Sequence, residues 1–321
     1  QNLSYTFDAI DNLLTRADVL QGLTETFEYD TVNRLTRATA QGSATVTKTY
    51  AYSANGNITS KSGVGTYTYG STRPHAVTQI QGIVNTTYTY DANGNQLTGG
   101  GRTITYTVFN KPKTIVGSNG TTRFFYDVNN NRFKKTTATN TTIYVGKLYE
   151  RVVTGSLTEH KHYIYGGKNL VATYTQRNNG TKEFRYVHTD HLDSINVLTD
   201  DNGIAIERLS FDPHGKRRNQ NGSDATGPIT SSINRGYTRH EHDDEVGLIN
   251  MNARLYDPIT GRFIAPDTII PSAGDSQAYN RYAYVENNPL SLVDPTGHAS
   301  LRKIVRNAAR AYTRYQITNA V

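Results

Sequence analysis

The sequence contains neither cysteine nor tryptophan and only one methionine, and hydrophobic residues make up only 36% of its 321 positions. The absence of cysteine excludes disulfides and thiolate metal sites and leaves the redox compartment undetermined. No stretch approaches the roughly 20 consecutive apolar residues that a membrane-spanning helix needs. We therefore expect a chain without a membrane span, whose core depends on residues other than large aliphatic ones.

The net charge of +7 is concentrated near one end of the chain. Residues 299–321 hold five basic residues and no acidic residue, so only +2 remains for the first 298 residues. A nucleic-acid-binding face needs a dense basic surface, because the phosphate backbone supplies most of the affinity. We expect no nucleic-acid partner.

Tyrosine and glycine are abundant, with 23 and 27 residues. The tyrosines recur in a short motif that alternates aromatic residues with other side chains and ends in aspartate, as in Tyr5–Asp8, Phe27–Asp30 and Tyr88–Asp91. The motif returns about every 20 residues, and alternation with period two is typical of half-buried strands. A repeat of this length predicts units that bury a face only by stacking on one another.

A turn signal follows the motif in several units. Ser53–Asn57 and Asp91–Asn95 each contain an Asn-Gly pair, which favours a tight hairpin with positive φ. A short returning strand such as Gln96–Thr98 comes next. Each unit is therefore predicted to be one hairpin, and successive hairpins to form a continuous sheet with almost no helix before residue 299.

The stretch 247–298 has a different composition. Its X-Pro turns at Asp257-Pro258, Asn288-Pro289 and Asp294-Pro295 mark short loops, because proline fixes φ and Asn or Asp bonds the backbone two residues on. The runs RLYDPITGRFIAPD and NRYAYVENNPLSLVDPTGH, with YVHTDHLD further upstream, resemble the core domain of RHS/YD-repeat proteins. That family includes bacterial polymorphic toxins and the C subunits of insecticidal Tc toxins.

The resemblance implies an all-β fold in which stacked YD-repeat hairpins form a spiral shell, closed by an RHS core domain and followed by a short helix. It assigns residues 1–183 to the YD-repeat shell and 184–298 to the RHS-associated core domain. Residues 299–321 would be the start of a variable toxin or effector region. Apolar residues at helical spacing, from Leu301 to Tyr315, predict a helix there.

The resemblance also implies a function. The chain would be the C-terminal part of a shell that encapsulates a toxic effector, with that effector as cargo and with N-terminal shell or delivery-system components as further partners. The protein would be secreted, or presented at the cell surface by a bacterial secretion system. No cofactor is implied.

The catalytic residues that the resemblance implies are Asp267 and Asp294, which would cut the chain once, between His298 and Ala299. Two carboxylates held close together cannot both ionise easily, so one can keep a proton while the other acts as a base. Leucine is more usual than His298 at this position in the family. The activity would therefore be that of an aspartic-type autoprotease.

Arginines near these aspartates are candidate supporting residues, because charge-assisted hydrogen bonds orient carboxylates and keep them ionised. Arg262 is the first choice, five residues before Asp267, followed by Arg254 and Arg281. The structural alternative is that the aspartates only cap turns. Histidine-rich stretches around His188 and His240 contain zinc-ligand residue types, but bonds to loop backbone are the favoured interpretation and no metal is predicted.

A second class of function remains open. A non-proteolytic cell-surface β-repeat protein that binds carbohydrate or neighbouring cells would use the tyrosine-rich faces for stacking on sugars. A self-assembling fibre would use an unpaired edge of the hairpin sheet. An intact chain distinguishes both from a self-cleaving shell.

Overall fold

The computed structural model describes residues 1–270 and 274–298, so Ala299 and the helix predicted after it lie outside the described residues. None of the described residues lies in an α-helix. The 3-10 turns are η1 (Val19–Gln21), η2 (Tyr237–Arg239), η3 (Ser276–Tyr279) and η4 (Val285–Asn287). The strands are β1 (Leu3–Phe7), β2 (Leu13–Asp18), β3 (Leu23–Tyr29), β4 (Leu35–Gln41), β5 (Thr45–Tyr52), β6 (Ile58–Lys61), β7 (Gly65–Tyr69), β8 (Val77–Gly82), β9 (Thr86–Thr87), β10 (Thr89–Tyr90), β11 (Gln96–Gly99), β12 (Arg102–Tyr106), β13 (Pro112–Gly117), β14 (Gly120–Tyr126), β15 (Arg132–Thr136), β16 (Asn140–Val145), β17 (Tyr149–Thr154), β18 (Leu157–Gly166), β19 (Asn169–Arg177), β20 (Lys182–Thr189), β21 (Ile195–Thr199), β22 (Ala205–Arg208), β23 (Ser210–Phe211), β24 (Arg217–Arg218), β25 (Glu241–Asp243), β26 (Leu248–Asn250), β27 (Leu255–Asp257) and β28 (Arg262–Phe263).

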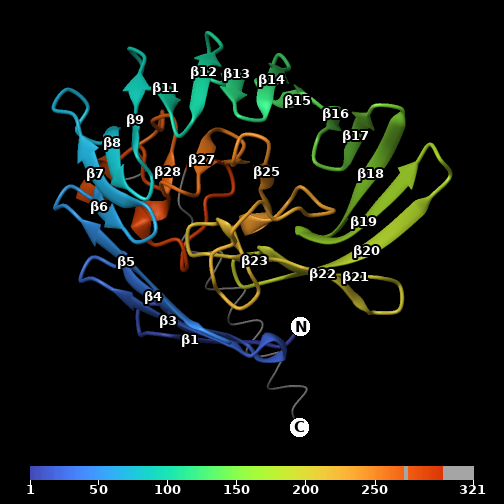
Figure 1. The fold of residues 1–321 in the computed structure, drawn as a ribbon, viewed down its shortest axis with the longest axis horizontal. Coiled ribbons are helices and arrows are strands. Elements are labelled where there is room, and N and C mark those ends of the chain that lie inside the picture. The colour runs from blue at the N-terminus through green and yellow to red at the C-terminus, as the bar shows by residue number, and fades with distance from the viewer. Residues whose placement is uncertain (271–273, 299–321) are drawn as a thin grey trace.

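The repeats form a curved wall of antiparallel strands in sequence order. A 9-stranded sheet runs from β1 to β9 and a 13-stranded sheet from β10 to β22. Only Tyr88 separates the two sheets, and its N–H donates to Thr78 O, which continues the wall across the break. In Figure 1 this wall curves around the later part of the chain. The predicted stacking of hairpins into a shell is confirmed.

The repeats share a contact made by a tyrosine, and several share a second contact made by the aspartate that follows the aromatic residue. Ser53, Gly70 and Thr107 stand at the aspartate position in three of the units. The Asp carboxylate accepts hydrogen bonds from backbone N–H groups two and four residues on, as Asp8, Asp30 and Asp127 do. The preceding tyrosine hydroxyl donates to the carbonyl of the first residue of an earlier strand, over 2.6 to 2.9 Å, in Tyr29, Tyr52, Tyr69, Tyr90, Tyr106 and Tyr126. The YD pair thus closes its own turn and fastens it to the previous unit.

The turns differ in detail from the two-residue hairpin that an Asn-Gly pair favours. In the pairs ending at Gly56 and Gly94 only the glycine has positive φ, at 77° and 88°. The strand register shifts at a bulge just before these turns. The bulged turn prevails because the residue at the start of the loop caps it, and one left-handed residue then completes the reversal.

The inner face of the wall forms the core together with residues 209–270 and 274–298, here called the inner segment. Leu13 and Leu35 of the wall lie in one apolar cluster with Tyr237, Tyr256 and Tyr284 of the inner segment. Burying an aliphatic side chain of this size contributes about 1.5–3 kcal/mol. The inner segment therefore needs the wall in order to bury its own apolar residues.

Charged residues also point inward from the wall, and five of them meet an opposite charge on the inner segment, whereas Lys61 donates to the carbonyls of Pro258 and Ile259. Arginine, lysine and carboxylate side chains are almost never fully buried without such partners. The pairs are Glu25 with Arg218 at 2.7 Å, Lys48 with Asp212 at 3.5 Å, Lys135 with Asp243 at 2.7 Å, Glu150 with Arg235 at 3.0 Å, and Arg102 with Asp257.

The wall extends beyond the predicted boundary between residues 183 and 184. That boundary falls inside β20, and β21 and β22 then extend the same sheet to Arg208. The two ends of the wall meet, since Gln1 Nε2 donates to Thr189 O and Arg16 lies 3.5 Å from Asp190 (Figure 1). The described part of the chain contains no helix long and apolar enough to span a membrane.

Candidate functional site

The candidate site lies at the open end of one short hairpin of the inner segment. Strands β27 and β28 pair antiparallel, with Tyr256 opposite Phe263. Arg254 directly precedes β27 and Asp267 follows β28, so the hairpin brings these two residues to the same end. Its tight turn at Pro258–Gly261 forces this arrangement.

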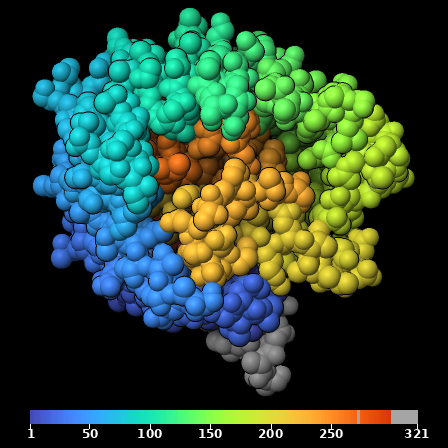
Figure 2. Space-filling model, in the orientation of Figure 1, coloured from blue at the N-terminus to red at the C-terminus, as the bar shows by residue number. Residues whose placement is uncertain are grey.

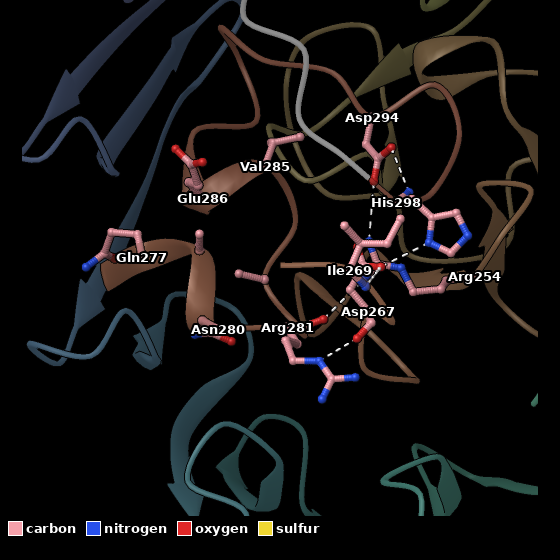
Figure 3. A pocket seen from close by; sticks show the side chains of 12 residues that line it. Arg254, Asp267, Ile269, Gln277, Asn280, Arg281, Val285, Glu286, Asp294 and His298 are labelled. Carbon is pink, nitrogen blue, oxygen red and sulfur yellow. Dashed lines mark hydrogen bonds and ion pairs between the residues drawn. The ribbon is translucent and has the colours of Figure 1, made fainter. Parts of the chain in front are cut away.

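A single guanidinium nitrogen holds both candidate aspartates. Arg254 Nη2 lies 2.8 Å from Asp267 Oδ2 and 3.4 Å from Asp294 Oδ2. The other arginine nitrogens bond to backbone, Nη1 to Arg281 O at 2.9 Å and Nε to Gly297 O. The guanidinium also stacks 3.6 Å from the centre of the Phe263 ring. Arg254 therefore fixes the two carboxylates relative to each other (Figure 3).

Burial makes the charges of this cluster interdependent. The side chains of Arg254, Asp267 and Asp294 expose only 7%, 8% and 3% of their surface. Burial lowers the pKa of Arg254 to about 10, while the two aspartates oppose that shift. The guanidinium still carries its charge at neutral pH and compensates one of the two carboxylates.

The loop that ends at the predicted cleavage position is wrapped around Asp294. Its Oδ1 accepts hydrogen bonds from the backbone N–H of Gly297 at 2.8 Å, His298 at 3.1 Å and Thr296 at 3.3 Å. Gly297 has a φ of 78°, and a Cβ at that position would lie 2.2 Å from Met251 O. Only glycine fits there, and the Asp-Pro-Thr-Gly sequence thus sets the path of the chain into His298.

Asp267 is bound from three further directions. Its Oδ1 accepts from Ile269 N at 3.0 Å and lies 3.0 Å from His298 Nδ1. Its backbone N–H donates to Arg281 O at 2.9 Å, and Arg281 Nε donates to Asp267 O. The imidazole next to the predicted cleavage position is therefore in direct contact with one candidate catalytic carboxylate, which residue types alone did not suggest.

The arginine ranked first from the sequence lies elsewhere. Arg262 Nη2 donates to Asn280 Oδ1 at 2.7 Å and to His75 O at 3.2 Å, and its guanidinium lies over the Tyr69 ring. It joins the wall to the inner segment. The structure thus brings Arg254 and Arg281, but not Arg262, to the aspartates.

The histidine-rich stretches are bonded within the fold. His191 Nε2 lies 2.9 Å from Leu290 O, His240 Nδ1 lies 2.8 Å from Thr238 Oγ1, and His242 Nε2 accepts from Tyr237 N at 3.0 Å. Within residues 1–270 and 274–298, no group of three or more His, Asp or Glu side chains is arranged to hold a metal ion.

Two cavities meet at His298. A small one of about 40 Å³ is lined by Arg254, Asp267, Asp294 and His298. A large one of about 910 Å³ lies between strands β14–β18 of the wall and the inner segment, and residues 295, 296 and 298 form part of its lining. The hollow is visible in Figure 2 between the hairpins and the inner segment. His298 thus lies at the boundary between the candidate site and the large cavity.

The sequence model of the Teneurin YD-shell family matches residues 2–290, which include the whole wall and both the Arg254 and the Asp267 positions. The chain belongs to the Teneurin YD-shell family. As an RHS/YD-repeat protein it is related to toxins. The tRNA3(Ser)-specific nuclease WapA of Bacillus spizizenii is 31% identical over 304 residues, which cover 92% of this chain and 11% of that protein.

Two further comparisons extend the relation. The toxin subunit YenC2 of Yersinia entomophaga is 28% identical over 123 residues, which cover 37% of this chain and 12% of that protein. The crystal structure of TcdB2-TccC3 without its hypervariable C-terminal region superposes with a TM-score of 0.73 at 18% identity, over 92% of this chain and 17% of that one. This likeness shows the shared fold. The chain spans only about a tenth of the length of the curated relatives it matches.

Proposed function

We propose that this chain is the part of a toxin shell that releases its own effector by self-cleavage, through hydrolysis of the peptide bond between His298 and Ala299. The family membership and relatives described as nucleases and as a toxin subunit support the shell with a C-terminal effector as its cargo. Further shell components and a bacterial delivery route outside the producing cell belong to the same proposal.

The observation that carries the proposal is the shared guanidinium. Arg254 holds Asp267 and Asp294 together through one nitrogen, and Asp294 binds the N–H of His298. Carboxylates that serve only as turn caps need no common partner. Here the two are buried side by side next to the residue whose peptide bond would be cut.

The chemistry of the pair is hydrolysis without a covalent intermediate. The ionised aspartate accepts a proton from a water molecule, whose oxygen attacks the carbonyl carbon of His298. The protonated aspartate gives its proton to the amide nitrogen of Ala299 as the C–N bond breaks. One water is consumed, a carboxyl group and an amine form, and the pair keeps one proton overall.

Mass spectrometry of the denatured chain tests the proposal. The wild-type chain is expected to yield two masses that correspond to residues 1–298 and 299–321. Asp267→Asn and Asp294→Asn are each expected to yield one intact mass, because an amide can neither accept the water proton nor supply the second one.

Asp200→Asn is the matched control, since Asp200 caps a turn through Asn202 N and Ile204 N far from the site. It should split as the wild type does. Native gel filtration should show the wild-type 1–298 fragment with the retention of the folded chain. A wild type that stays intact, or a split that persists in both site variants, would falsify the autoproteolytic role.

A further inference from the structure

The imidazole of His298 contacts a carboxylate oxygen of Asp267, one member of the proposed catalytic pair. Its Nδ1 lies 3.0 Å from Asp267 Oδ1, and 38% of its side-chain surface is exposed. The main chain of the same residue is held by Asp294. A residue at the bond to be cut thus contacts both carboxylates, one through its ring and one through its backbone.

We propose that His298 controls the rate of the proposed self-cleavage, because its protonated ring holds Asp267 ionised and so withholds the proton that the aspartate pair needs. The inference rests on the proposed function and adds a regulating residue to it. His298 acts through Asp267 and is therefore a positioning residue.

The charges around the ring explain the direction of the effect. On one side it faces Arg254, Asp267 and Asp294, and Arg281 and Glu286 line the same small cavity. On the other side charged and titratable residues line the large cavity, namely Lys111, Asp127, Arg132, Lys147, Lys168, Arg235, Arg239, His240 and Glu241. Arg254 compensates one carboxylate, so an imidazolium compensates the second and leaves the cluster neutral with both aspartates ionised. A neutral ring removes this second positive charge, and the pair then takes up a proton more readily.

The effect proposed here depends on the charge of the ring, so the influence of His298 on the cleavage rate should depend on pH. We expect His298→Leu to split faster than the wild type at pH 5.5, by about tenfold, a usual effect of one neighbouring charge on a carboxyl group. The ratio of the two rates should fall toward one by pH 8. The measurement is the first-order appearance of the 1–298 fragment after refolding at each pH.

His298→Asn is the matched control. Its amide N–H can donate to Asp267 but does not titrate, so its rate relative to His298→Leu should not change with pH. If the ratio of the cleavage rates of His298→Leu and the wild type is the same at every pH, the charge of His298 does not regulate cleavage and the proposal is overturned. A leucine variant that is slower than the wild type throughout would overturn it as well.

A second readout does not depend on cleavage. In Asp294→Asn, which stays intact, the ¹⁵N chemical shifts of the His298 ring above pH 8 should show the proton on Nδ1, because the hydrogen bond selects the tautomer. Adding Asp267→Asn should move it toward Nε2. If NMR shows the contact in Asp294→Asn but the wild type never splits, the proposed function is refuted, whereas a wild type that splits with a flat rate ratio refutes only the role of His298.

Discussion

At the scale of single residues, Arg254 is the side chain that contacts both candidate aspartates and the backbone on either side of them. It reaches both aspartates, the carbonyl of Gly297 and the carbonyl of Arg281, with its ring-stacked guanidinium buried over Phe263. Sequence distance alone favours Arg262, which is nearer to Asp267. The hairpin reverses this ranking, because its two open ends come together while Arg262 lies further along toward the turn.

Replacing Arg254 by glutamine should abolish self-cleavage, with a loss of about 100-fold or more, because the two carboxylates lose their common anchor. The same change leaves buried charges unpaired and should lower the free energy of unfolding by about 3–5 kcal/mol. The cleavage rate by mass spectrometry and urea unfolding measure the two effects.

Arg262→Gln is the control for that experiment. It removes a buried arginine of the same hairpin whose partners are Asn280 and the His75 carbonyl. It should lower stability but leave the rate of cleavage close to that of the wild type. Equal losses of cleavage in the two variants would show that the defect comes from general unfolding and not from the carboxylates.

At the scale of strands, the inward charges couple each hairpin to the inner segment. Asp243, which is completely buried, receives Lys135 from β15 at 2.7 Å and Arg132 at 3.0 Å. Lys135 lies between two half-buried neighbours on its strand, Lys134 and Thr136, and in the sequence it is indistinguishable from a surface lysine. Its partner lies 108 residues away, so no local pattern predicts the pair.

Asp243→Asn should lower the free energy of unfolding by about 3–5 kcal/mol, because it leaves two buried cations facing an uncharged amide. Glu28→Gln is a matched change at an exposed pair, where Arg37 lies 3.9 Å away and both side chains are largely exposed. It should cost less than about 1 kcal/mol. Urea unfolding of both variants distinguishes a wall fastened by buried charges from one held by apolar contacts alone, for which the two costs would be similar.

At the scale of the whole molecule, buried histidines make the shell sensitive to acid. Burial lowers the pKa values of His191, His214 and His242, and it lowers the pKa of His240 to about 4. An unfolded histidine titrates near pH 6.5, so the unfolded chain binds more protons than the folded chain between about pH 6.5 and 4. Stability should therefore fall as the pH falls through this window.

His240 alone should account for a loss on the order of 3 kcal/mol by pH 4. The free energy of unfolding measured in urea between pH 7 and 4 tests this, and His240→Gln should show a shallower decline. Below about pH 4, Asp212 and Glu241 should add a second loss, since their lysine neighbours help to hold both pKa values near about 2 against burial. A stability that stays constant from pH 7 to 4.5 would contradict the histidine contribution.

The sequence predicts the wall well because the information for each hairpin is local. Alternating aromatic residues set the strand faces, and an aromatic residue followed by a turn recurs from unit to unit, with aspartate as the first residue of the turn in several units. It predicts the identity of the two aspartates only through the family resemblance. The position of the inner segment, the role of Arg254 and the His298 contact depend on residues brought together from distant parts of the chain, which no periodicity reveals.

The meeting of the first and last hairpins has a mechanical consequence. Neighbouring strands of the wall share ladders of backbone hydrogen bonds, whereas Gln1 and Arg16 reach the turn at Thr189 and Asp190 through side chains, with Tyr5 against the His191 ring. Side-chain contacts rupture one at a time, while a strand ladder resists shear as a unit. A pulling force on the closed wall would therefore separate its two ends at this seam first. The wall would then open while every pair of hydrogen-bonded strands stays intact.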